Sequence, residues 1–209
     1  MKIQILKRSL IIGLVAALSI TSNAQTREKI WSFGPELGAN FSKFGRDADD
    51  TDYITGLIMG GFVTYSIRNT HAYTAKVLFS QKGARDAASN TTAQLNYVEV
   101  PLIVRLFFNR DGNVRPNIFA GPSFGFLNNV KVKVADGDFE KLDDYEDVYN
   151  TFDVGLGLGL GLNIRVGDEI YFIVDTRYTY GFSDLSKSGS DVNNQAIGVT
   201  AGLSFGIGN

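Results

Sequence analysis

The stretch that decides the fold is FDVGLGLGLGLNI, residues 152–164, in which apolar side chains alternate with glycine or a small polar residue. Side chains on a β-strand alternate between its two faces, so this stretch predicts a strand with one unbroken apolar face and one almost empty face. Glycine weakens a strand in water, and a soluble sandwich would expose polar side chains instead. Lipid on the leucine face and a crowded lumen on the glycine face account for the pattern, as in a transmembrane β-barrel.

The overall composition does not reveal this alternation of apolar and small residues. The chain is 44% hydrophobic with a mean hydropathy of −0.01, which is ordinary for a soluble domain. Barrel strands alternate apolar and polar residues, so averaged hydropathy does not detect them. The 23 glycines, 15 phenylalanines and 9 tyrosines suit many strands with aromatic girdles. With no cysteine, the chain cannot form disulfides, thiolate metal sites or a cysteine-linked lipid anchor.

The N-terminus resembles a targeting segment. Lys2, Lys7 and Arg8 precede a short apolar run over residues 9–20, and Ser22 and Ala24 occupy the small-residue positions before a cleavage site. This predicts a cleaved secretory signal peptide at residues 1–24 and a barrel domain at 25–209. The alternative is a retained anchor, but the apolar run is short for a membrane span. Cleavage would remove three cations from a chain that has 20 basic and 22 acidic residues. The mature chain would then be acidic and would lack the basic surface that nucleic-acid binding needs.

Seven further segments repeat the alternation. With 152–164 they predict an all-β fold, an eight-stranded antiparallel up-and-down transmembrane β-barrel, with strands near 31–44, 57–67, 73–82, 95–108, 117–127, 170–182 and 194–207. Long links (45–56, 83–94, 128–150, 183–193) alternate with short ones (68–72, 109–115, 165–169), which places both termini in the periplasm. The rival is a soluble lipocalin-like barrel, but a lipocalin pocket is apolar and this inner face carries glycines and charges.

Three motifs connect the chain to a known family. Residues 95–106 read LNYVEVPLIVRL, residues 78–83 read LFSQKG, and residues 119–125 read FAGPSFG. In this order they resemble the signature of the PorT-like small outer-membrane barrels of Bacteroidetes. The resemblance covers nearly the whole mature chain and implies an outer-membrane barrel; most members have no assigned reaction. Lys76 departs from the glutamate that the family often has in its third strand.

The inward parity of the predicted strands collects charged residues. They are Glu36, Lys76, Glu99, Arg105, Asp153, Arg165, Asp175 and Arg177. An eight-stranded barrel has an interior just wide enough for side chains, where charges must be paired. We therefore expect a structural polar network, with a proton or ion path as the alternative. The glycines of 155–161 leave room for Arg105, Arg177, Tyr97 and Phe119.

Residues for catalysis or metal binding are scarce. His71 is the only histidine and falls in a short turn, so a catalytic triad at the outer rim is not available. The links at 46–52 and 135–147 are acidic, but neither matches an EF-hand loop, so we expect solvated loops. The sequence predicts no enzyme, no cofactor and no metal site. Divalent bridging to lipopolysaccharide is the alternative for the acidic links.

The predicted function is therefore a structural or interaction role in the cell envelope. The lumen is expected to be filled by side chains, with the external loops available for binding. The expected partners are outer-membrane lipid, lipopolysaccharide and other envelope proteins, with no nucleic acid and no small-molecule substrate. The alternatives are a narrow channel, an accessory component of a secretion or assembly machine, a lipid-modifying enzyme and a soluble lipocalin-like binder.

Overall fold

The computed structural model describes residues 30–207 apart from 49, 68–69, 110–111 and 188. The expected signal peptide, residues 1–24, lies outside the described residues. Within them, no helix combines the length and the apolar character that crossing a membrane requires.

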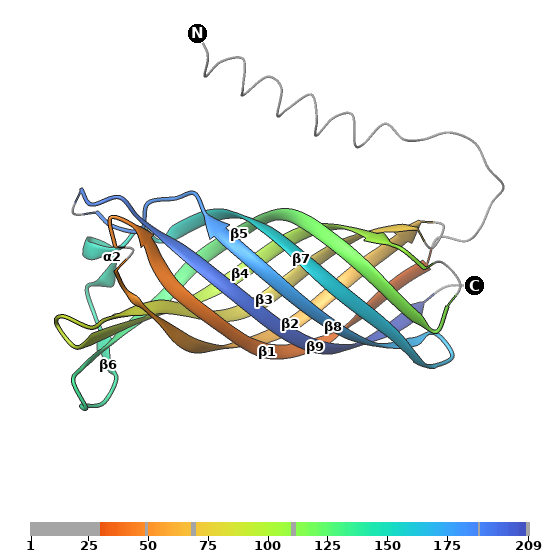
Figure 1. Ribbon diagram of the computed structural model, residues 1–209, viewed down its shortest axis with the longest axis horizontal. Coiled ribbons are helices and arrows are strands. Elements are labelled where there is room, and N and C mark those ends of the chain that lie inside the picture. The colour runs from red at the N-terminus through yellow and green to blue at the C-terminus, as the bar shows by residue number, and fades with distance from the viewer. Residues whose placement is uncertain (1–29, 49, 68–69, 110–111, 188, 208–209) are drawn as a thin grey trace, which may run out of the picture.

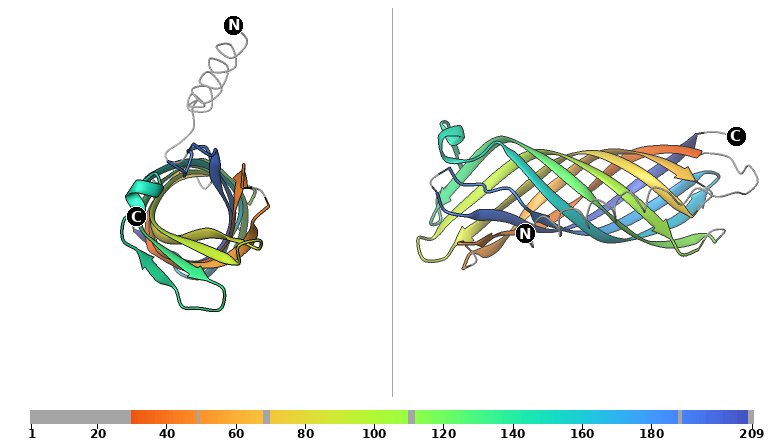
Figure 2. Two further views of the ribbon diagram at one scale, coloured as in Figure 1. Left: turned by 90° about the vertical axis from the view of Figure 1, so that its left-hand side faces the viewer. Right: turned by 90° about the horizontal axis from the view of Figure 1, so that it is seen from above.

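Eight long strands close into the expected antiparallel barrel (Figures 1 and 2). They are β1 (Ile30–Arg46), β2 (Asp52–Ile67), β3 (His71–Asp86), β4 (Thr91–Phe107), β5 (Val114–Val134), β7 (Phe152–Gly167), β8 (Ile170–Gly181) and β9 (Val192–Ile207). Each strand pairs with its neighbour along the wall, and β9 pairs with β1 to close it. The short strand β6 (Glu140–Leu142) and helix α2 (Tyr145–Val148) lie outside the wall.

The two ends of the barrel differ. We call the end with β6 and α2 the loop end, and the opposite end, where β2 ends at Ile67, β3 begins at His71 and residues 168–169 join β7 to β8, the turn end. Several strands extend further at the loop end than the sequence predicted, so the expected long links 45–56 and 83–94 shrink to 47–51 and 87–90. The expected loop 128–150 is also wrong in part, because β5 continues to Val134 and β6 pairs beside it. Val130, in this extension, is fully buried.

The outward face has the lipid-facing character that the alternation predicted. Leu158 and Leu160 of β7 are 62% and 66% exposed without lipid, whereas the alternate positions of the same strand face inward. Aromatic pairs lie outward at both ends of the wall. The tilted rings of Trp31 and Tyr65 have centroids 4.8 Å apart at the turn end, and those of Phe126 and Phe152 have centroids 5.3 Å apart nearer the loop end. Such belts are typical of the two membrane interfaces.

The glycines of β7 make room for side chains from other strands, as expected. A Cβ at Gly159 would overlap the ring of Phe119 and the backbone oxygen of Thr176. A Cβ at Gly157 would lie 3.1 Å from Cδ of Arg177, and one at Gly161 would lie 2.5 Å from Nη1 of Arg105. The three expected neighbours Phe119, Arg177 and Arg105 are therefore in place.

Tyr97 is the exception to that expectation. Its ring lies 3.2 Å from the Cβ position of Gly125 on β5, not against a glycine of β7. The register explains the difference, because Tyr97 and Gly125 lie close to each other across the β4–β5 pair, where Tyr97 pairs with Leu127.

Three alanine substitutions along β7 should differ in cost because their surroundings differ. We expect Gly159→Ala to lower the free energy of unfolding by about 1–3 kcal/mol, since Phe119 and backbone both block the new methyl group. Gly157→Ala should cost less, because the Arg177 side chain can move aside. Gly167→Ala is the matched control, with its nearest contact an ordinary 3.5 Å. Urea unfolding in detergent measures all three, and equal stability across them would show that the lumen is not packed at Gly159.

Candidate functional site

Seven of the eight predicted inward charges lie buried in the lumen, between 0% and 8% exposed. They are Glu36, Lys76, Glu99, Arg105, Asp153, Asp175 and Arg177. Strand alternation brings them inward, and the wall register decides which of them meet. The eighth, Arg165, is exposed near the turn end, where its guanidinium lies 5.9 Å from the ring centre of Tyr171.

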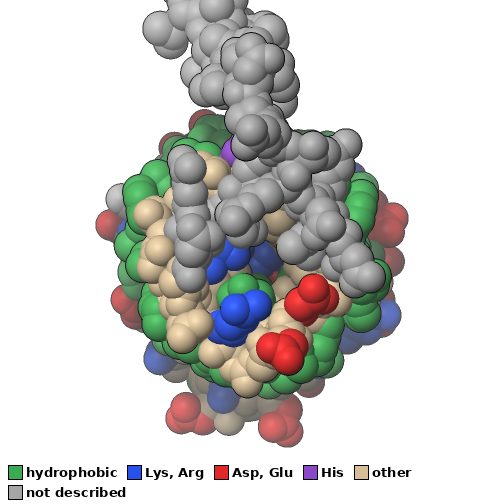
Figure 3. All heavy atoms as spheres, turned by 90° about the vertical axis from the view of Figure 1, so that its right-hand side faces the viewer, with side chains coloured by type: hydrophobic (Ala, Val, Ile, Leu, Met, Phe, Trp, Pro, Cys, Tyr) green, Lys and Arg blue, Asp and Glu red, His purple; other side chains and the backbone are tan. Residues whose placement is uncertain are grey.

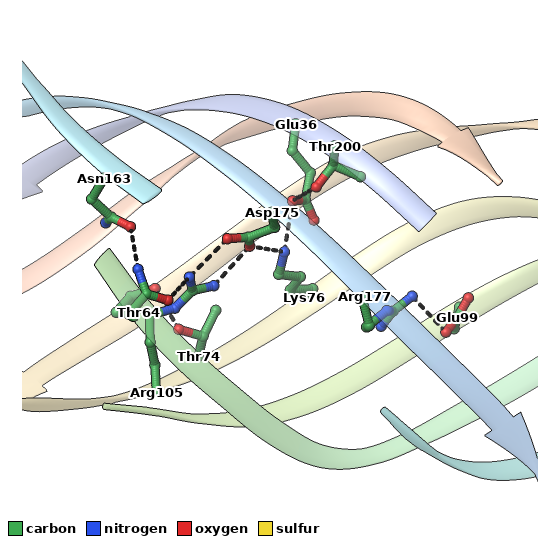
Figure 4. Close-up of polar contacts among 11 residues, drawn as sticks. Glu36, Thr64, Thr74, Lys76, Glu99, Arg105, Asn163, Asp175, Arg177 and Thr200 are labelled. Carbon is green, nitrogen blue, oxygen red and sulfur yellow. Dashed lines mark hydrogen bonds and ion pairs between the residues drawn. The ribbon is translucent and has the colours of Figure 1, made fainter. Parts of the chain in front are cut away.

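Four of these side chains form an ion-pair quartet, which Figure 4 shows. By their positions along the strands, they lie in the half of the lumen nearer the turn end. Asp175 of β8 receives two hydrogen bonds from Arg105 of β4, at 2.8 and 2.7 Å. It also pairs with Nζ of Lys76 of β3 at 3.2 Å. Lys76 donates a 2.7 Å hydrogen bond to Glu36 of β1. The quartet therefore joins four strands and carries no net charge.

A second cluster lies around Glu99, which is fully buried. One carboxylate oxygen accepts hydrogen bonds from Ser123 at 2.6 Å and from Arg177 at 2.9 Å, and the other pairs with Lys82 at 3.2 Å. Sequence reasoning missed Lys82 as a lumen charge because the predicted strand ended there. Lys82 and Lys76 are separated by an even number of residues on the same strand, which places both side chains on the same face. This spacing could have identified Lys82 as a lumen charge.

Asp153 lies apart from both clusters. Its Oδ2 atom accepts a 3.0 Å hydrogen bond from Asn194, whose amide also donates to Tyr97 at 3.1 Å. Among the described residues, no cation lies within ion-pair distance of this carboxylate. The nearest excess of positive charge is in the Glu99 cluster, in which two cations face one acid. In all, four buried carboxylates accompany five buried cations, which are Lys76, Lys82, Arg105, Arg115 and Arg177.

An apolar cluster closes the lumen at the loop end. We call it the outer cap, and its buried members are Leu95, Tyr97, Leu127, Val130 and Leu185. Leu185 comes from the β8–β9 connection and is 1% exposed. Its backbone N–H donates to the oxygen of Val192 at 2.7 Å, and its oxygen accepts from Asn150 at 2.8 Å. The connection is thereby fixed across the mouth.

A funnel opens at the turn end. It has a volume of about 180 Å³ and is lined by both polar and aromatic side chains. The quartet lies at its deep end, and Arg165 and Tyr171 lie nearer its mouth. Lys and Arg side chains gather at the centre of this face, with acidic ones to one side (Figure 3). The sequence predicted a lumen filled by side chains throughout, but the funnel is open. Beyond the quartet, a cavity beside Phe119 and Arg177 has only about 10 Å³.

The described residues contain no cluster of three or more histidine, cysteine or acidic side chains suited to hold a metal ion. His71 begins β3 at the turn end, with its ring edge-on to Tyr73 at 6.2 Å. Neither a nucleophile nor a second base accompanies it among its hydrogen-bonded or stacked neighbours described here. What the printed contacts of the lumen show is charge compensation by ion pairs.

Asp175 should be costly to neutralise, because two buried cations share it. We expect Asp175→Asn to lower the free energy of unfolding by about 3–5 kcal/mol, since Lys76 and Arg105 lose a buried partner. Asp143→Asn is the control, because its 3.9 Å pair with Lys141 is exposed and should contribute at most about 1 kcal/mol. Urea unfolding in detergent compares them, and equal losses would contradict the structural role of the quartet.

The connection that carries Leu185 should depend on pH. Asp184 accepts hydrogen bonds from the backbone N–H groups of Ser186 and Val192, which hold the pKa of its carboxyl below the usual range. A lowered pKa stabilises the connection above about pH 4, and this contribution is lost as pH falls through the lowered value. The methyl NMR signals of Leu185 should shift in that acid range. In Asp184→Asn this step should be absent; a step that persists would assign it to another group.

Comparisons with known proteins agree with this architecture. No curated protein matches the chain. Neisserial surface protein A is similar in structure, with a TM-score of 0.54 and 14% identity, over 84% of this chain and 96% of that one. The outer membrane protein OprG from Pseudomonas aeruginosa has a TM-score of 0.54 and 10% identity, over 88% of this chain and 98% of that one. At these identities the likeness shows the fold alone. The model of the outer membrane protein beta-barrel domain matches residues 23–187, and the chain therefore belongs to that family.

Proposed function

We propose that this protein is a non-enzymatic outer-membrane barrel whose loop end is an interaction surface. The observation that carries the proposal is the double closure of the lumen. The outer cap blocks the loop end, and beyond the quartet the ring of Phe119 and the Arg177 side chain fill the space over the β7 glycines. A barrel closed at two levels has no continuous path for a solute, which argues against the channel alternative.

The loop end offers an ordered surface. β5 extends beyond β7 and pairs with β4 on one side and β6 on the other. Tyr145 of α2 donates a 2.9 Å hydrogen bond to the backbone oxygen of Asn128, and the N–H of Lys187 donates to the oxygen of Val148. These contacts connect three segments into one platform, on which Phe139 is 45% exposed. An ordered platform with exposed apolar and acidic side chains suits binding of another envelope protein.

The orientation belongs to the same proposal. The longest connections, 135–151 and 182–191, lie at the loop end, and the turn end carries both ends of the described chain. Outer-membrane barrels have short periplasmic turns and longer external loops. We therefore place the loop end outside the cell and both termini in the periplasm.

We also assign the chain to the PorT-like group of this family on the three motifs. They lie on the adjacent strands β3, β4 and β5, and their inward residues meet in the lumen. Lys82, Glu99 and Ser123, one from each motif, make the cluster around Glu99. The three motifs therefore have a structural role, because each supplies a side chain to the cluster that fills this part of the lumen.

The closed lumen gives a direct test. The full-length protein in a planar lipid bilayer should show no steady conductance. Leu185→Ala should also remain closed, because Phe119 and the Glu99 cluster block the lumen beneath the outer cap. A stable open pore in the parent protein would favour the channel instead.

Site-specific photocrosslinking in whole cells tests the interaction surface. A photoreactive amino acid in place of Phe139 should give a discrete protein adduct, since this side chain projects from the loop end. The matched control is the same replacement at Leu160, which is 66% exposed on the lipid face and should give no protein adduct. No adduct at 139, or the same adduct at both positions, would contradict the proposed surface.

A further inference from the structure

We propose that the outward face of the β5–β6 hairpin at the loop end is a binding site for the phosphate groups of lipopolysaccharide. The proposal rests on the proposed orientation, because this lipid lies in the leaflet that faces out of the cell. The sequence suggested lipopolysaccharide as a partner, with divalent ions bridging it to the acidic links as the alternative. The hairpin offers a direct contact through lysine side chains instead.

The hairpin has an apolar face and a basic face. Val130 is fully buried in the outer cap, and Val132 and Leu142 pack against the same cluster. Residues that alternate with these three point to the opposite face. We call that opposite face the lysine face, after Lys131 and Lys133 of β5 and Lys141 of β6. Three cations therefore lie together on the side of the hairpin that is turned away from the lumen.

Two of these lysines repel each other. Lys131 and Lys141 are directly paired in the register of β5 and β6, and like charges in opposite positions destabilise a sheet. Within the described part of the chain, Lys131 has no ion-pair partner, and Lys141 has only an exposed contact with Asp143 at 3.9 Å. Asp136 and Asp138, in the turn of the hairpin, form no ion pair with the lysine face. An anion bound between the two ammonium groups would remove their repulsion.

The excess of positive charge extends to β3. Thr92 of β4 pairs with Arg85 on one side and with Lys133 on the other, so Arg85 lies on the same face as the lysines. The acids on this face are Asp143 beside Lys141, and Asp52, which pairs with Arg85 in the register of β2 and β3. Four cations thus accompany two acids here, although acids outnumber bases in the whole chain. This separation of charge indicates an anionic partner.

The lysine face continues the lipid-facing side of the wall. Leu127 and Val130 both belong to the outer cap, because the register of β4 and β5 shifts beside them. Phe126 and Lys131 therefore share the outward face. Lys131 follows Phe126 by five residues, which puts it about 13 Å higher on a strand tilted by roughly 40°. That height is above the acyl chains and within the layer of sugars and phosphates.

The polarity of this face changes in the order that a membrane surface requires. Between the ring of Phe126 and the lysines, Asn96 and Asn129 form an amide pair at 2.6 Å. The outward side chains therefore change from rings to amides to cations with height, as the membrane changes from acyl chains to headgroups. The hairpin also leans away from the barrel axis, which turns the lysine face toward the membrane surface (Figures 1 and 2). Lysine clusters in this position attract anionic headgroups, and lysine is a common ligand of phosphate.

Native mass spectrometry of the full-length protein in nonionic detergent tests the site with defined lipids. Diphosphoryl lipid A should bind, and lipid A without phosphates should bind at least about tenfold more weakly. Tripolyphosphate separates a membrane lipid from a soluble polyanion. At equal phosphate concentration it should not displace lipid A, because the acyl chains of lipid A also contact the wall. Displacement by tripolyphosphate, or equal binding of the two forms of lipid A, would overturn the proposal.

A charge reversal on the lysine face localises the binding. Lys131→Glu should weaken diphosphoryl lipid A about tenfold or more. It should not lower stability in urea, because a glutamate opposite Lys141 replaces repulsion with a cross-strand ion pair. Lys187→Glu is the matched control, since Lys187 is exposed on the β8–β9 connection at the same end of the barrel. Equal weakening in both variants would indicate nonspecific attraction and refute the site, as would unchanged binding in Lys131→Glu.

A separate measurement tests the orientation on which the proposal rests. The chain has no cysteine, so Lys187→Cys provides a single thiol at the loop end. A membrane-impermeant maleimide added to intact cells should label it. Labelling together with lipid A binding that does not depend on Lys131 would refute the lysine face and leave the orientation intact. Binding that depends on Lys131 without labelling would refute the orientation, and with it lipopolysaccharide as the natural ligand.

Discussion

A lumen only about as wide as a few side chains must be filled, and every charge in it must be compensated. Asp175 meets both requirements, because it binds Arg105 from β4 and Lys76 from β3 in the half of the lumen nearer the turn end. Lys76 extends the contact to Glu36 on β1. Strands far apart around the wall are thereby connected through the lumen as well as through their neighbours. The glycines of β7 are the counterpart of this arrangement, since they leave the space that Arg105, Arg177 and Phe119 occupy.

The two ends of the lumen are lined by different kinds of side chain. At the loop end, the β8–β9 connection places Leu185 among apolar side chains from β4 and β5, all of them buried. At the turn end, the wall residues are serines, threonines and charged groups, and a funnel remains. The lumen is therefore lined by apolar side chains at the loop end and by polar ones at the turn end, and the funnel ends at the quartet.

The three sequence motifs on β3, β4 and β5 supply side chains that meet in the lumen. Each motif alternates lipid-facing and lumen-facing residues, and only the second set interacts across strands. Lys82, Glu99 and Ser123 meet because β3, β4 and β5 are neighbours in the required register. Because the barrel is closed, Arg177 of β8 reaches the same carboxylate from the far wall. A sequence signature that looks like three separate strands is one lumen cluster in the folded chain.

The sequence by itself determined the fold and the face of nearly every residue, because a period of two is a local property of an extended chain. From that period alone, Phe119, Arg105 and Arg177 were placed opposite the glycines, and seven charges were placed in the lumen. Which charges meet was decided only by the tertiary structure, because pairing depends on height and angle in the barrel, which follow from strand register and closure. For the same reason Tyr97 lies over Gly125, Arg165 lies exposed near the mouth, and Asp153 has no adjacent cation. The outer cap and the funnel could not be predicted from the sequence either. Each is formed by segments from different parts of the chain, which only the closed barrel brings together.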